Sequence, residues 1–583
     1  MATVPVIPFA CANDAPDTSP TCKGKGQLAC GNCHLVLYCG KECQKAHWSA
    51  HKTVCKSSIG KSNWRPDWDR ECRDPAWASG AAQTNAHNPY GGGVFLWGNV
   101  PAIDVLRLAE NEGVTYDEDI QLLFAASGDL RNVVKTISEL PATTRQEIRI
   151  TINDKEFAVV ARNVILLLFV LDTLSVATPN GGKSRFLVAE ALIHLWYSAF
   201  VPASMLSMVR NVVRPFISDI CTKIANKNPA ACLGKSWTFA SGRSLRLVLS
   251  KDQWLRLDRM LCAHDLTWER AKDVRHAVVL APERSDFRDR WDFNEPTPFS
   301  RIAKGRFRED GLLLPFGHSR VGFDTPNILL FQNSETWLMN DKADPLDGWP
   351  VWEVLRHPSP AKEDRYGKLY AYLCETFEGF LDRLATLDIH FEMYCVDARE
   401  LKNHLAPDKF MRIEASNISD VAHLGVGETL SCLSPLLQPP QSNPHATLIS
   451  LFLNAVLEIA KRTGANSNPI YTKAAMKYLP IPDISSLLKS QGAETYRLWD
   501  ARHFFIDLDM LFGLYRQCFY FDNLSTQLGV SEKECNTIVE KWPIRLKLRH
   551  GQDGAQEEFM VLLGSNFSGT ERYVEWKRKG AKN

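Results

Sequence analysis

The amino-acid sequence predicts an α/β protein, with a core of parallel strands and helices that is interrupted by a large insertion and preceded by a small metal-stabilised module. Three observations predict this fold class. Cysteines are concentrated in residues 11–55. Buried, strand-like runs near residues 120 and 390 are each followed by a turn and a helical pattern. The stretch between these runs carries its own helical periodicity, so it is an insertion and not a loop.

Composition and charge narrow the class of protein. The 583 residues include 45% apolar and 23% charged residues, which are ordinary globular values. A formal net charge of +1 argues against nucleic acid as a partner. Residues 1–10 lack the pattern of a signal peptide, and the longest apolar run, 164–171, is short of the roughly 20 residues that cross a bilayer. We therefore expect no membrane partner and a cytoplasmic location, with the nucleus as the alternative.

The cysteine-rich stretch contains eight candidate metal ligands, the number that two tetrahedral zinc ions need. One pair of cysteines is separated by two residues, and two further pairs have the i, i+4 spacing that places side chains on one helix face. A disulfide framework would leave an odd cysteine and would not use the histidine. The candidates are Cys11, Cys22, Cys30, Cys33, Cys39, Cys43, His51 and Cys55.

These residues also carry a family resemblance. The run Cys30-Gly-Asn-Cys33, Leu37-Tyr38-Cys39, Cys43-Gln44, Trp48-x2-His51-Lys52 and Cys55 resembles a MYND-type zinc finger. The resemblance implies two interleaved zinc sites. One would comprise Cys11, Cys22, Cys39 and Cys43, and the other Cys30, Cys33, His51 and Cys55. The family usually opens with Cys-x2-Cys, whereas ten residues separate Cys11 from Cys22 here. His47 is an alternative ligand, because it follows Cys43 by four residues.

The resemblance also implies a function. Zinc sites that are fully ligated by protein are structural and not catalytic. MYND fingers bind short, often proline-rich, peptide segments of other proteins. A groove for such a peptide would be lined here by Leu35, Val36, Tyr38, Gln44 and Trp48. The rival interpretation is that the finger packs against its own chain.

The first α/β unit begins after a linker at 56–66. Residues 121–126 predict a buried parallel strand, and Asp129 follows as the N-cap of a helix. A second strand at 147–153 ends directly before Asp154, and a buried helix follows at 162–171. A strand, a glycine turn and a helix, with an acid after the second strand, are typical of a Rossmann-like core. Gly128, Asp129 and Asp154 are therefore candidate cofactor-binding residues. The alternative is that the two acids are only a helix cap and a turn residue.

A similar unit recurs further along the chain. Residues 390–396 and 410–417 predict the third and fourth strands, and Asp397 follows the third. Helices are expected at 430–437 and 445–460. This order is similar to that of Rossmann-like methyltransferases, in which Asp397 would contact the adenine of S-adenosylmethionine.

A second resemblance covers this core. Leu96-Trp97-Gly98-Asn99-Val100-Pro101-Ala102-Ile103-Asp104 and residues 122–132 resemble an uncharacterised domain of fungal MYND proteins. They are also similar to the amino-terminal region of the dynein axonemal assembly factor 3 group. The resemblance implies a methyltransferase-like fold more strongly than an activity, because Ser127-Gly128-Asp129 lacks the several glycines of an active methyltransferase loop.

The rest of the chain completes the expected organisation. Helical patterns occupy 184–217, 366–387 and 507–519, then continue at 534–542, and 284–348 is expected to be irregular surface. Strands are expected at 244–250 and 543–549, the latter pairing with 560–563 and 571–576. His264, His276 and His318 lack a spacing that would pair them as ligands. The expected division is a finger at 11–55, a linker at 56–66, a Rossmann-like core at 67–180 and 386–460, an insertion at 181–385, and a carboxyl-terminal α/β region at 461–583.

The sequence thus favours a non-catalytic adaptor that binds two zinc ions and other proteins, and it predicts no catalytic residue. The alternative is an S-adenosylmethionine-dependent methyltransferase with Gly128, Asp129, Asp154 and Asp397 around the cofactor. Whether the protein is an enzyme stays open at this point. The closed zinc sites and the single glycine of the loop favour a protein without catalytic activity.

Overall fold

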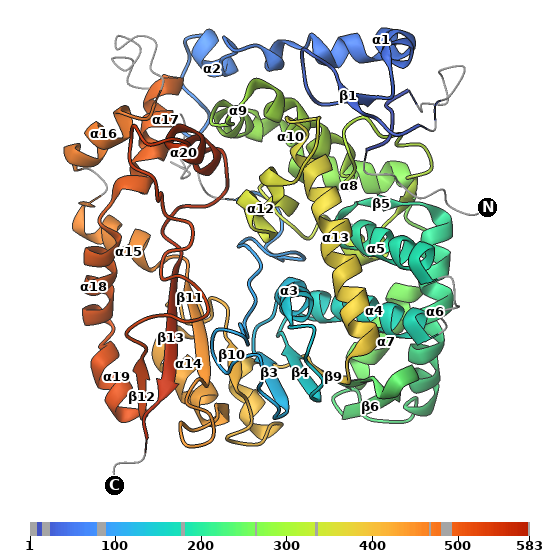
Figure 1. Cartoon of the computed structure of the whole chain (residues 1–583), viewed down its shortest axis with the longest axis vertical. Helices are drawn as coiled ribbons and strands as arrows, with labels where there is room; N and C mark the ends of the chain where they lie inside the picture. Colours follow the sequence, from blue (N-terminus) through green and yellow to red (C-terminus); the bar gives the residue numbers. More distant parts are fainter. Residues whose placement is uncertain are drawn as a thin grey trace.

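The protein is built around a large central mixed sheet (Figure 1). The computed structural model describes residues 9–13, 22, 24–78, 89–175, 181–262, 265–332, 336–465, 468–479 and 492–580. Within these residues the sheet has nine strands. In spatial order they are β12 (Val530–Glu532), β13 (Arg572–Arg578), β11 (Thr447–Phe452), β10 (Arg412–Glu414), β3 (Ile120–Phe124), β4 (Ile148–Asn153), β9 (Ile389–Tyr394), β7 (Ser244–Ser250) and β6 (Cys232–Thr238).

The middle of the sheet is parallel and its edges are antiparallel. The strands from β11 through β10, β3, β4 and β9 to β7 all run in one direction. At one side β13 runs against β11 and β12 runs against β13, and at the other side β6 runs against β7. Strand β11 is buried along its whole length, which is typical of a parallel strand covered on both sides, whereas β4 and β9 alternate apolar with polar residues.

One face of the sheet is covered by a helical layer around α4 (Phe157–Ser175). This helix is apolar all round, and helix α13 (Arg365–Thr386) packs against it, against α3 (Arg131–Glu139) and against α5 (Gly181–Tyr197). By length and composition alone α4 is long and apolar enough to cross a membrane, but 83% of its most apolar window is buried inside the protein. Such burial is what a core helix shows.

A second apolar cluster surrounds β11 and β13. Phe452 on β11 contacts the rings of Phe512 and Tyr515 on α18 (Leu508–Cys518), and Phe521 contacts Trp576 on β13. The helices of this layer are α14 (Gly425–Leu433), α15 (Ala455–Thr463), α18 and α19 (Phe521–Gln527).

The finger lies at one end of the molecule, at the upper right of Figure 1. It consists of β1 (Leu28–Ala29), β2 (Leu37–Tyr38) and α1 (Lys41–Cys55), followed by the short helix η1 (Ser58–Gly60). η1 packs against α10 (Pro298–Asp310). A Cβ atom on Gly60 would lie 2.8 Å from Cδ1 of Ile302, so a larger residue here would displace that side chain.

Several expected elements differ in the structure. Residues 445–460 are not one helix, because β11 occupies 447–452 and α15 begins only at Ala455. The six residues of β11 are all buried, and an apolar run that is buried on every side does not distinguish strand from helix by periodicity. The expected strand at 543–549 and the expected helix at 534–542 are absent from these described stretches. Residues 560–563 belong to helix α20 (Ala555–Leu563), and 571–576 pair with β11 and β12 through β13.

The expected insertion contributes to the central sheet. β7 was predicted as a strand, and the structure pairs it with β9, while β6 continues the sheet beyond it. Residues 284–310 are mainly helical, since they contain α9 (Ser285–Phe293) and α10, and not irregular surface. The described part of 311–348 is largely irregular, as expected, but most of it is buried or half-buried. His276 bonds the backbone oxygen of Glu309, and His264 lies outside the described residues.

The remaining elements connect these layers. They are α2 (Asp67–Arg70), β5 (Phe200–Val201), α6 (Ala203–Lys223), η2 (Ala240–Gly242), α7 (Lys251–Leu261), α8 (Trp268–Val279), η3 (Pro282–Arg284), β8 (Thr325–Pro326), α11 (Ile328–Phe331), η4 (Pro345–Gly348), α12 (Val351–Arg356), η5 (Ala398–Asn403), η6 (Ser434–Leu436), α16 (Pro469–Met476), α17 (Ala493–Ala501) and η9 (Arg502–Phe505).

Candidate metal centre

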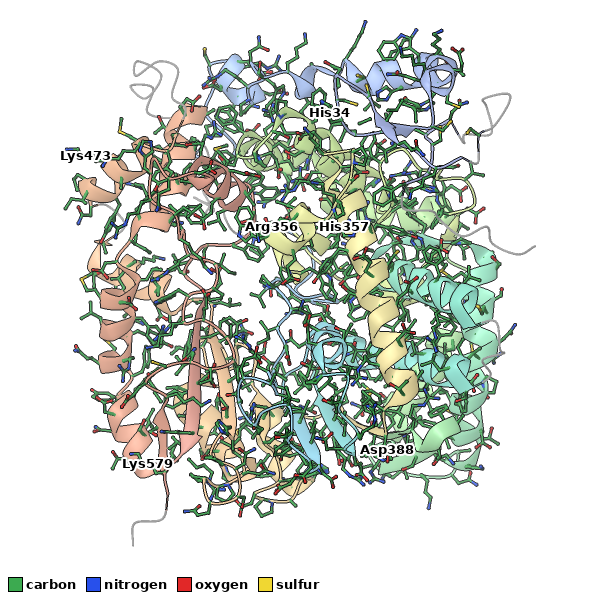
Figure 2. The ribbon with its side chains drawn as sticks, in the orientation of Figure 1. His34, Arg356, His357, Asp388, Lys473 and Lys579 are labelled. Atoms are coloured by element: carbon green, nitrogen blue, oxygen red, sulfur yellow. The ribbon has the colours of Figure 1, made fainter. Side chains whose placement is uncertain are left out.

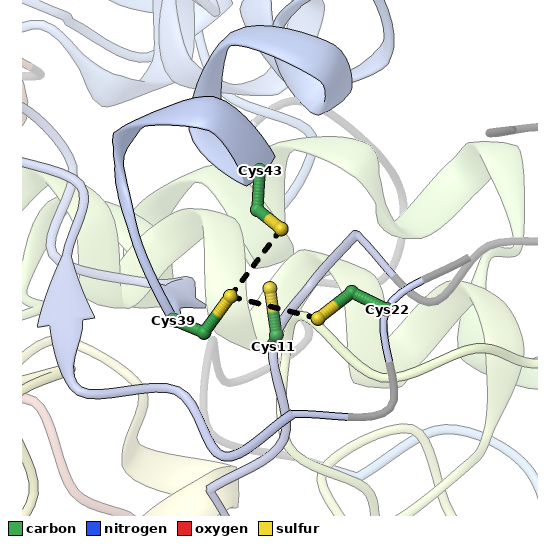
Figure 3. A group of neighbouring side chains, drawn as sticks. All are labelled: Cys11, Cys22, Cys39 and Cys43. Atoms are coloured by element: carbon green, nitrogen blue, oxygen red, sulfur yellow. Dashed lines mark hydrogen bonds between the residues drawn. The ribbon is translucent and has the colours of Figure 1, made fainter. Parts of the chain in front are cut away.

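The first cluster brings together four cysteines from three parts of the finger. Their sulfur atoms all lie within 4.8 Å of one another. The Sγ atom of Cys39 is 3.5 Å from that of Cys22 and 3.3 Å from that of Cys43 (Figure 3). A tetrahedral zinc ion with Zn–S bonds of about 2.3 Å separates its sulfurs by about 3.8 Å, so the cluster has the size of a zinc site. The fourth member is Cys11.

Backbone hydrogen bonds place Cys11 and Cys22 in this cluster. The N–H of Cys11 donates to the oxygen of Gly24 at 2.9 Å, and the N–H of Cys22 donates to the oxygen of Asn13 at 2.8 Å. The N–H of Gly24 donates to the Cys22 sulfur at 3.3 Å, where a Cβ atom on Gly24 would lie 3.2 Å from the same sulfur. The ten residues between the two cysteines therefore do not prevent their approach; residues 14–21 lie outside the described part.

The second cluster is fully buried. Cys30 and Cys55 have their sulfur atoms 3.8 Å apart, and the sulfur of Cys33 lies 3.4 Å from Nε2 of His51. All four ligand atoms lie within 4.8 Å of one another. The side chain of Asn32 donates from Nδ2 to the sulfur of Cys55 at 3.2 Å and to its backbone oxygen at 3.1 Å. An N–H donor of this kind stabilises a metal-bound thiolate.

The electrostatics of both clusters fit a bound cation. Burial raises the pKa of the Cys33 thiol, and the neighbouring thiols of Cys43 and Cys22 raise the pKa of Cys39 to about 12. Burial lowers the pKa of His51 to about 4, so the imidazole is neutral at pH 7, which is the form that binds metal. A zinc ion would supply the positive charge that lets the thiols ionise. Four protein ligands at each ion leave no open position, so the metal would be structural.

His47 is engaged elsewhere. Its Nδ1 lies 3.0 Å from the hydroxyl of Tyr38, and its ring stacks on that of His51 at a centroid distance of 5.9 Å. Neither ligand group in the described residues includes His47. It supports the orientation of His51 and does not replace it.

The finger packs against its own chain through its strand side. Leu35, Val36 and Tyr38, which were predicted to line a peptide groove, are at most 2% exposed. A Cβ atom on Gly317 would lie 3.5 Å from Cβ of Val36, and the N–H of Glu363 donates to the oxygen of His34 at 3.2 Å; His34 is labelled in Figure 2. Gln44 is only partly buried and Trp48 is 39% exposed, so of the five predicted lining residues only the two on α1 reach the surface.

The predicted cofactor residues lie at the carboxyl ends of β3, β4 and β9, where each already has partners within the protein. The N–H of Gly128 donates to the Asp154 carboxylate at 2.9 Å. Asp129 is 1% exposed and accepts from the N–H of Gly98 at 2.9 Å and from Nε1 of Trp196 at 3.2 Å. Asp129 also pairs with Arg131 at 2.6 Å. These residues stay predictions as cofactor ligands.

The structure also shows which of the acids at this edge cap a helix, and it adds a residue that was not singled out from the sequence. The N-cap of α3 is Leu130 and not Asp129, although Asp129 accepts from the N–H of Arg131 at 3.3 Å. Asp397 caps η5 and pairs with Arg399 at 2.9 Å. Asn153 was not singled out, yet its side chain donates to the backbone oxygens of Ala125 and Val396 and so links β3, β4 and β9. Its position directly before Asp154 was the available signal.

A third group of ionisable residues lies at the opposite end of the molecule from the finger, near Asp388 in Figure 2. It comprises Glu147, Asp388 and His390, with Nε2 of His390 at 3.3 Å from the Asp388 carboxylate. The group is partly exposed and two of its members are already engaged, His390 by Ser244 and Glu147 by Arg149. It has the character of a surface ion-pair network.

Two interleaved Cys/His clusters on a hairpin and one helix define a small di-zinc module that is carried by an α/β body. Comparison with protein families agrees: residues 19–55 match the model of the MYND finger, and residues 96–201 match a domain of unknown function, DUF4470. The chain therefore carries a MYND finger with two zinc-binding sites, a module that generally mediates protein–protein interaction. The finger match begins after Cys11, which the structure nevertheless brings to the first cluster. No solved structure matches the chain.

Proposed function

We propose that the protein is a non-catalytic adaptor whose MYND finger binds a peptide segment of another protein through the outward face of helix α1. The closed zinc sites support this proposal, because they offer no position for a substrate. The burial of Leu35, Val36 and Tyr38 supports it as well, since the strand side of the finger anchors it to the body and leaves α1 facing outward. The single observation that carries the proposal is the exposure of Trp48 on that helix.

The chemistry of this face indicates the kind of peptide. Lys45 and Lys52 lie three residues before and four residues after Trp48, so they flank it on the same side of the helix. The ammonium group of Lys56 lies 5.7 Å from the centre of the Trp48 ring. An exposed indole accepts a proline or another apolar side chain, and lysines around it favour acidic neighbours. The partner segment is therefore short, contains proline, and carries acidic residues beside it.

Display of random peptides against the intact, zinc-loaded protein tests this proposal. We expect enriched sequences that combine proline with acidic residues and that lose binding when Trp48→Ala is introduced. Trp499→Ala is the matched control, because Trp499 is 41% exposed on α17. Peptides that bind the Trp48→Ala protein as well as the unchanged protein would contradict the role of α1.

We also infer that the sheet is a Rossmann-like scaffold in the cytoplasm, or alternatively in the nucleus. The spatial order β9-β4-β3-β10-β11, parallel throughout and followed by the antiparallel β13, supports the scaffold. The same strand order favours the second candidate function, an S-adenosylmethionine-dependent methyltransferase, whereas the internal partners of Gly128, Asp129 and Asp154 favour the adaptor. Calorimetric titration with S-adenosylmethionine separates the two. Saturable heat that is lost in Asp397→Ala would overturn the purely adaptor function, and no heat at millimolar ligand would exclude the methyltransferase.

A further inference from the structure

A cavity of about 180 Å³ lies between the start of the DUF4470 segment and the turn before η4. Two extended segments form one wall, because the N–H groups of Gly92 and Val94 donate to the oxygens of Met339 and Leu338, both at 3.1 Å. A smaller cavity adjoins it and shares several residues with it. The shared residues are Trp97, Asn340, Lys342, Ala343, Asp344 and Asn566.

The carboxylates around these two cavities all have donors. Asp341 pairs with Arg284 at 2.7 Å. Asp344 accepts from the hydroxyl of Tyr366 at 2.8 Å and from the N–H of Leu346 at 3.0 Å. Asp347 accepts from Nδ2 of Asn566 at 2.7 Å. The acids on the wall therefore need no donor from a ligand.

Most of the cationic side chains here are matched too. Lys304 pairs with Glu295 at 2.7 Å, and Arg308 pairs with Asp292 at 2.8 Å. Arg275 donates to the backbone oxygens of Arg308 at 2.6 Å and Phe307 at 3.0 Å. These cationic groups hold the walls of the cavity in place, and their own partners within the protein already engage them.

Among the described residues, the groups around the two cavities that remain without a hydrogen-bond partner are all donors. The ammonium of Lys342 forms no hydrogen bond or ion pair with the described residues and lies 5.8 Å from the centre of the Trp291 ring. Asn340 is 7% exposed, and its side-chain oxygen accepts from the N–H of Lys342 at 2.9 Å, while its Nδ2 has no acceptor among the described residues. The buried indole N–H groups of Trp97, Trp291 and Trp337 likewise find no acceptor there.

The Lys342 ammonium and the Asn340 amide line the larger cavity, and donors without a partner are costly unless an acceptor-rich group occupies the space beside them. Burial lowers the pKa of Lys342, and burial raises the pKa of Asp347 to about 7, as expected where charge is held away from water without full compensation. An anion beside Lys342 would stabilise its ammonium form. Unmatched donors, an ammonium without an ion pair among the described residues, and aromatic walls are together the features of a small-molecule site.

We propose that this cavity binds a small organic carboxylate, with the carboxylate on Lys342 and Asn340 and an apolar body against Trp97. The cavity volume suits a body the size of one aromatic ring, because engineered cavities of about 150 Å³ hold benzene. A single negative charge on the ligand would pair with the ammonium of Lys342, which forms no ion pair with the described residues. A dianion such as a phosphate monoester would add a second charge beside Asp344 and Asp347, which is unfavourable. Trp97, Gly98 and Asn99 near one end of the DUF4470 match, and Tyr197 and Ala199 near the other, line the joined cavities, so that domain supplies one wall of the site.

Fluorine NMR of the intact protein with 4-fluorobenzoate as the probe tests the proposal. We expect saturable binding that is at least tenfold tighter than that of 4-fluorobenzyl alcohol, which has the same ring without the charge. 4-Fluorophenyl phosphate is expected to bind more weakly than the carboxylate. Equal affinity for the alcohol and the carboxylate would overturn the assignment of an anion site, and tighter binding of the phosphate would overturn the monoanion.

Two variants of residues in the cavity wall test whether the probe binds there. Lys342→Met keeps the length of the side chain without its charge and is expected to lower the affinity for 4-fluorobenzoate at least tenfold. The control Lys461→Met, at an exposed lysine of α15, is expected to leave this affinity unchanged. Asn340→Asp keeps the oxygen that accepts from Lys342 but sets a carboxylate against the probe, so we expect it to abolish binding. Undiminished binding in both cavity variants, each checked for an unchanged melting temperature, would refute the site.

Discussion

The carboxylate of Asp154 accepts a 2.9 Å hydrogen bond from the backbone N–H of Gly128. It also accepts from the N–H of Glu156 at 2.8 Å, so one side chain joins the loop after β3 to the end of β4. In open α/β sheets this loop is where a ligand phosphate or ribose usually sits. Here the chain satisfies the loop with its own carboxylate.

Asp154→Ala should therefore loosen the loop after β3. An N–H group that loses its partner costs about 1–3 kcal/mol, so we expect hydrogen exchange of a peptide covering residues 125–130 to become about tenfold faster or more. Exchange followed by mass spectrometry measures it. Asp397→Ala is the control, because that side chain pairs mainly with the exposed Arg399 and should leave the loop unchanged. Unaltered exchange in Asp154→Ala would show that the bond does not hold the loop.

Each of the two clusters should bind its own zinc ion, so a variant in one cluster should lose only that ion. Native mass spectrometry of the intact protein is expected to show two zinc masses, with one lost in Cys33→Ser and the other lost in Cys11→Ser or Cys39→Ser, since each ion needs its four ligands. Cys232→Ser is the control, as Cys232 is exposed and lies outside the finger. Two zinc ions retained by Cys11→Ser would remove Cys11 from the ligand set.

Asn32→Ala should lower the affinity of the second cluster for zinc and leave that of the first cluster unchanged. Its side chain donates to the Cys55 sulfur, and the loss of such an outer contact typically costs 10–100-fold in metal affinity. Competition with a colorimetric chelator measures the two affinities separately. Gln27→Ala, at an exposed position of the same finger, should change neither. Equal release of both ions in Asn32→Ala would contradict an effect confined to the second cluster.

Glu414 should make the protein less stable as the pH rises. Burial raises the pKa of this side chain to about 7, and its Oε2 atom has no partner among the described residues. The folded state keeps the proton that the unfolded chain loses near its ordinary pKa of 4.5. The stabilisation is therefore full below about pH 4.5 and is lost as the pH rises through 7.

Glu414→Gln removes this dependence. We expect the variant to gain stability relative to the unchanged protein between pH 5 and pH 8, by an amount on the order of 2 kcal/mol. Thermal unfolding across this range measures the difference, with Glu428→Gln as the control at an exposed position. Parallel pH profiles for the unchanged protein and Glu414→Gln would show that Glu414 does not titrate in this way.

Local sequence signals predicted the strands and helices that are defined by their own residues. The alternating isoleucines of 148–152 indicated β4, and the apolar runs indicated β3, β9 and α4. The ligand set of the finger followed from cysteine spacing and resemblance, and the structure brings each of the two quartets together. These features depend on residues that are near one another in the chain, which is why one sequence sufficed.

Features set by distant partners could not be predicted. The pairing of β7 with β9 joins residues such as Leu245 and Phe391, which no local pattern connects. Whether Leu35 and Val36 face a peptide or the body depended on Gly317, far along the chain. The donors around Lys342 and Asn340 come from segments that are ordinary loops in sequence and that only the fold brings to one cavity.

The position of β13 between β11 and β12 has a consequence for how the protein is made. During synthesis β11 emerges about 120 residues before β13, which at 5–20 residues per second is on the order of 10 s. Throughout that interval one long side of a hydrophobic, parallel sheet has no neighbouring strand, and an open edge of this kind invites pairing with other chains. During this interval the nascent protein can associate with other chains through the open edge of β11, and premature stop codons before residue 572 should yield aggregated and not soluble fragments.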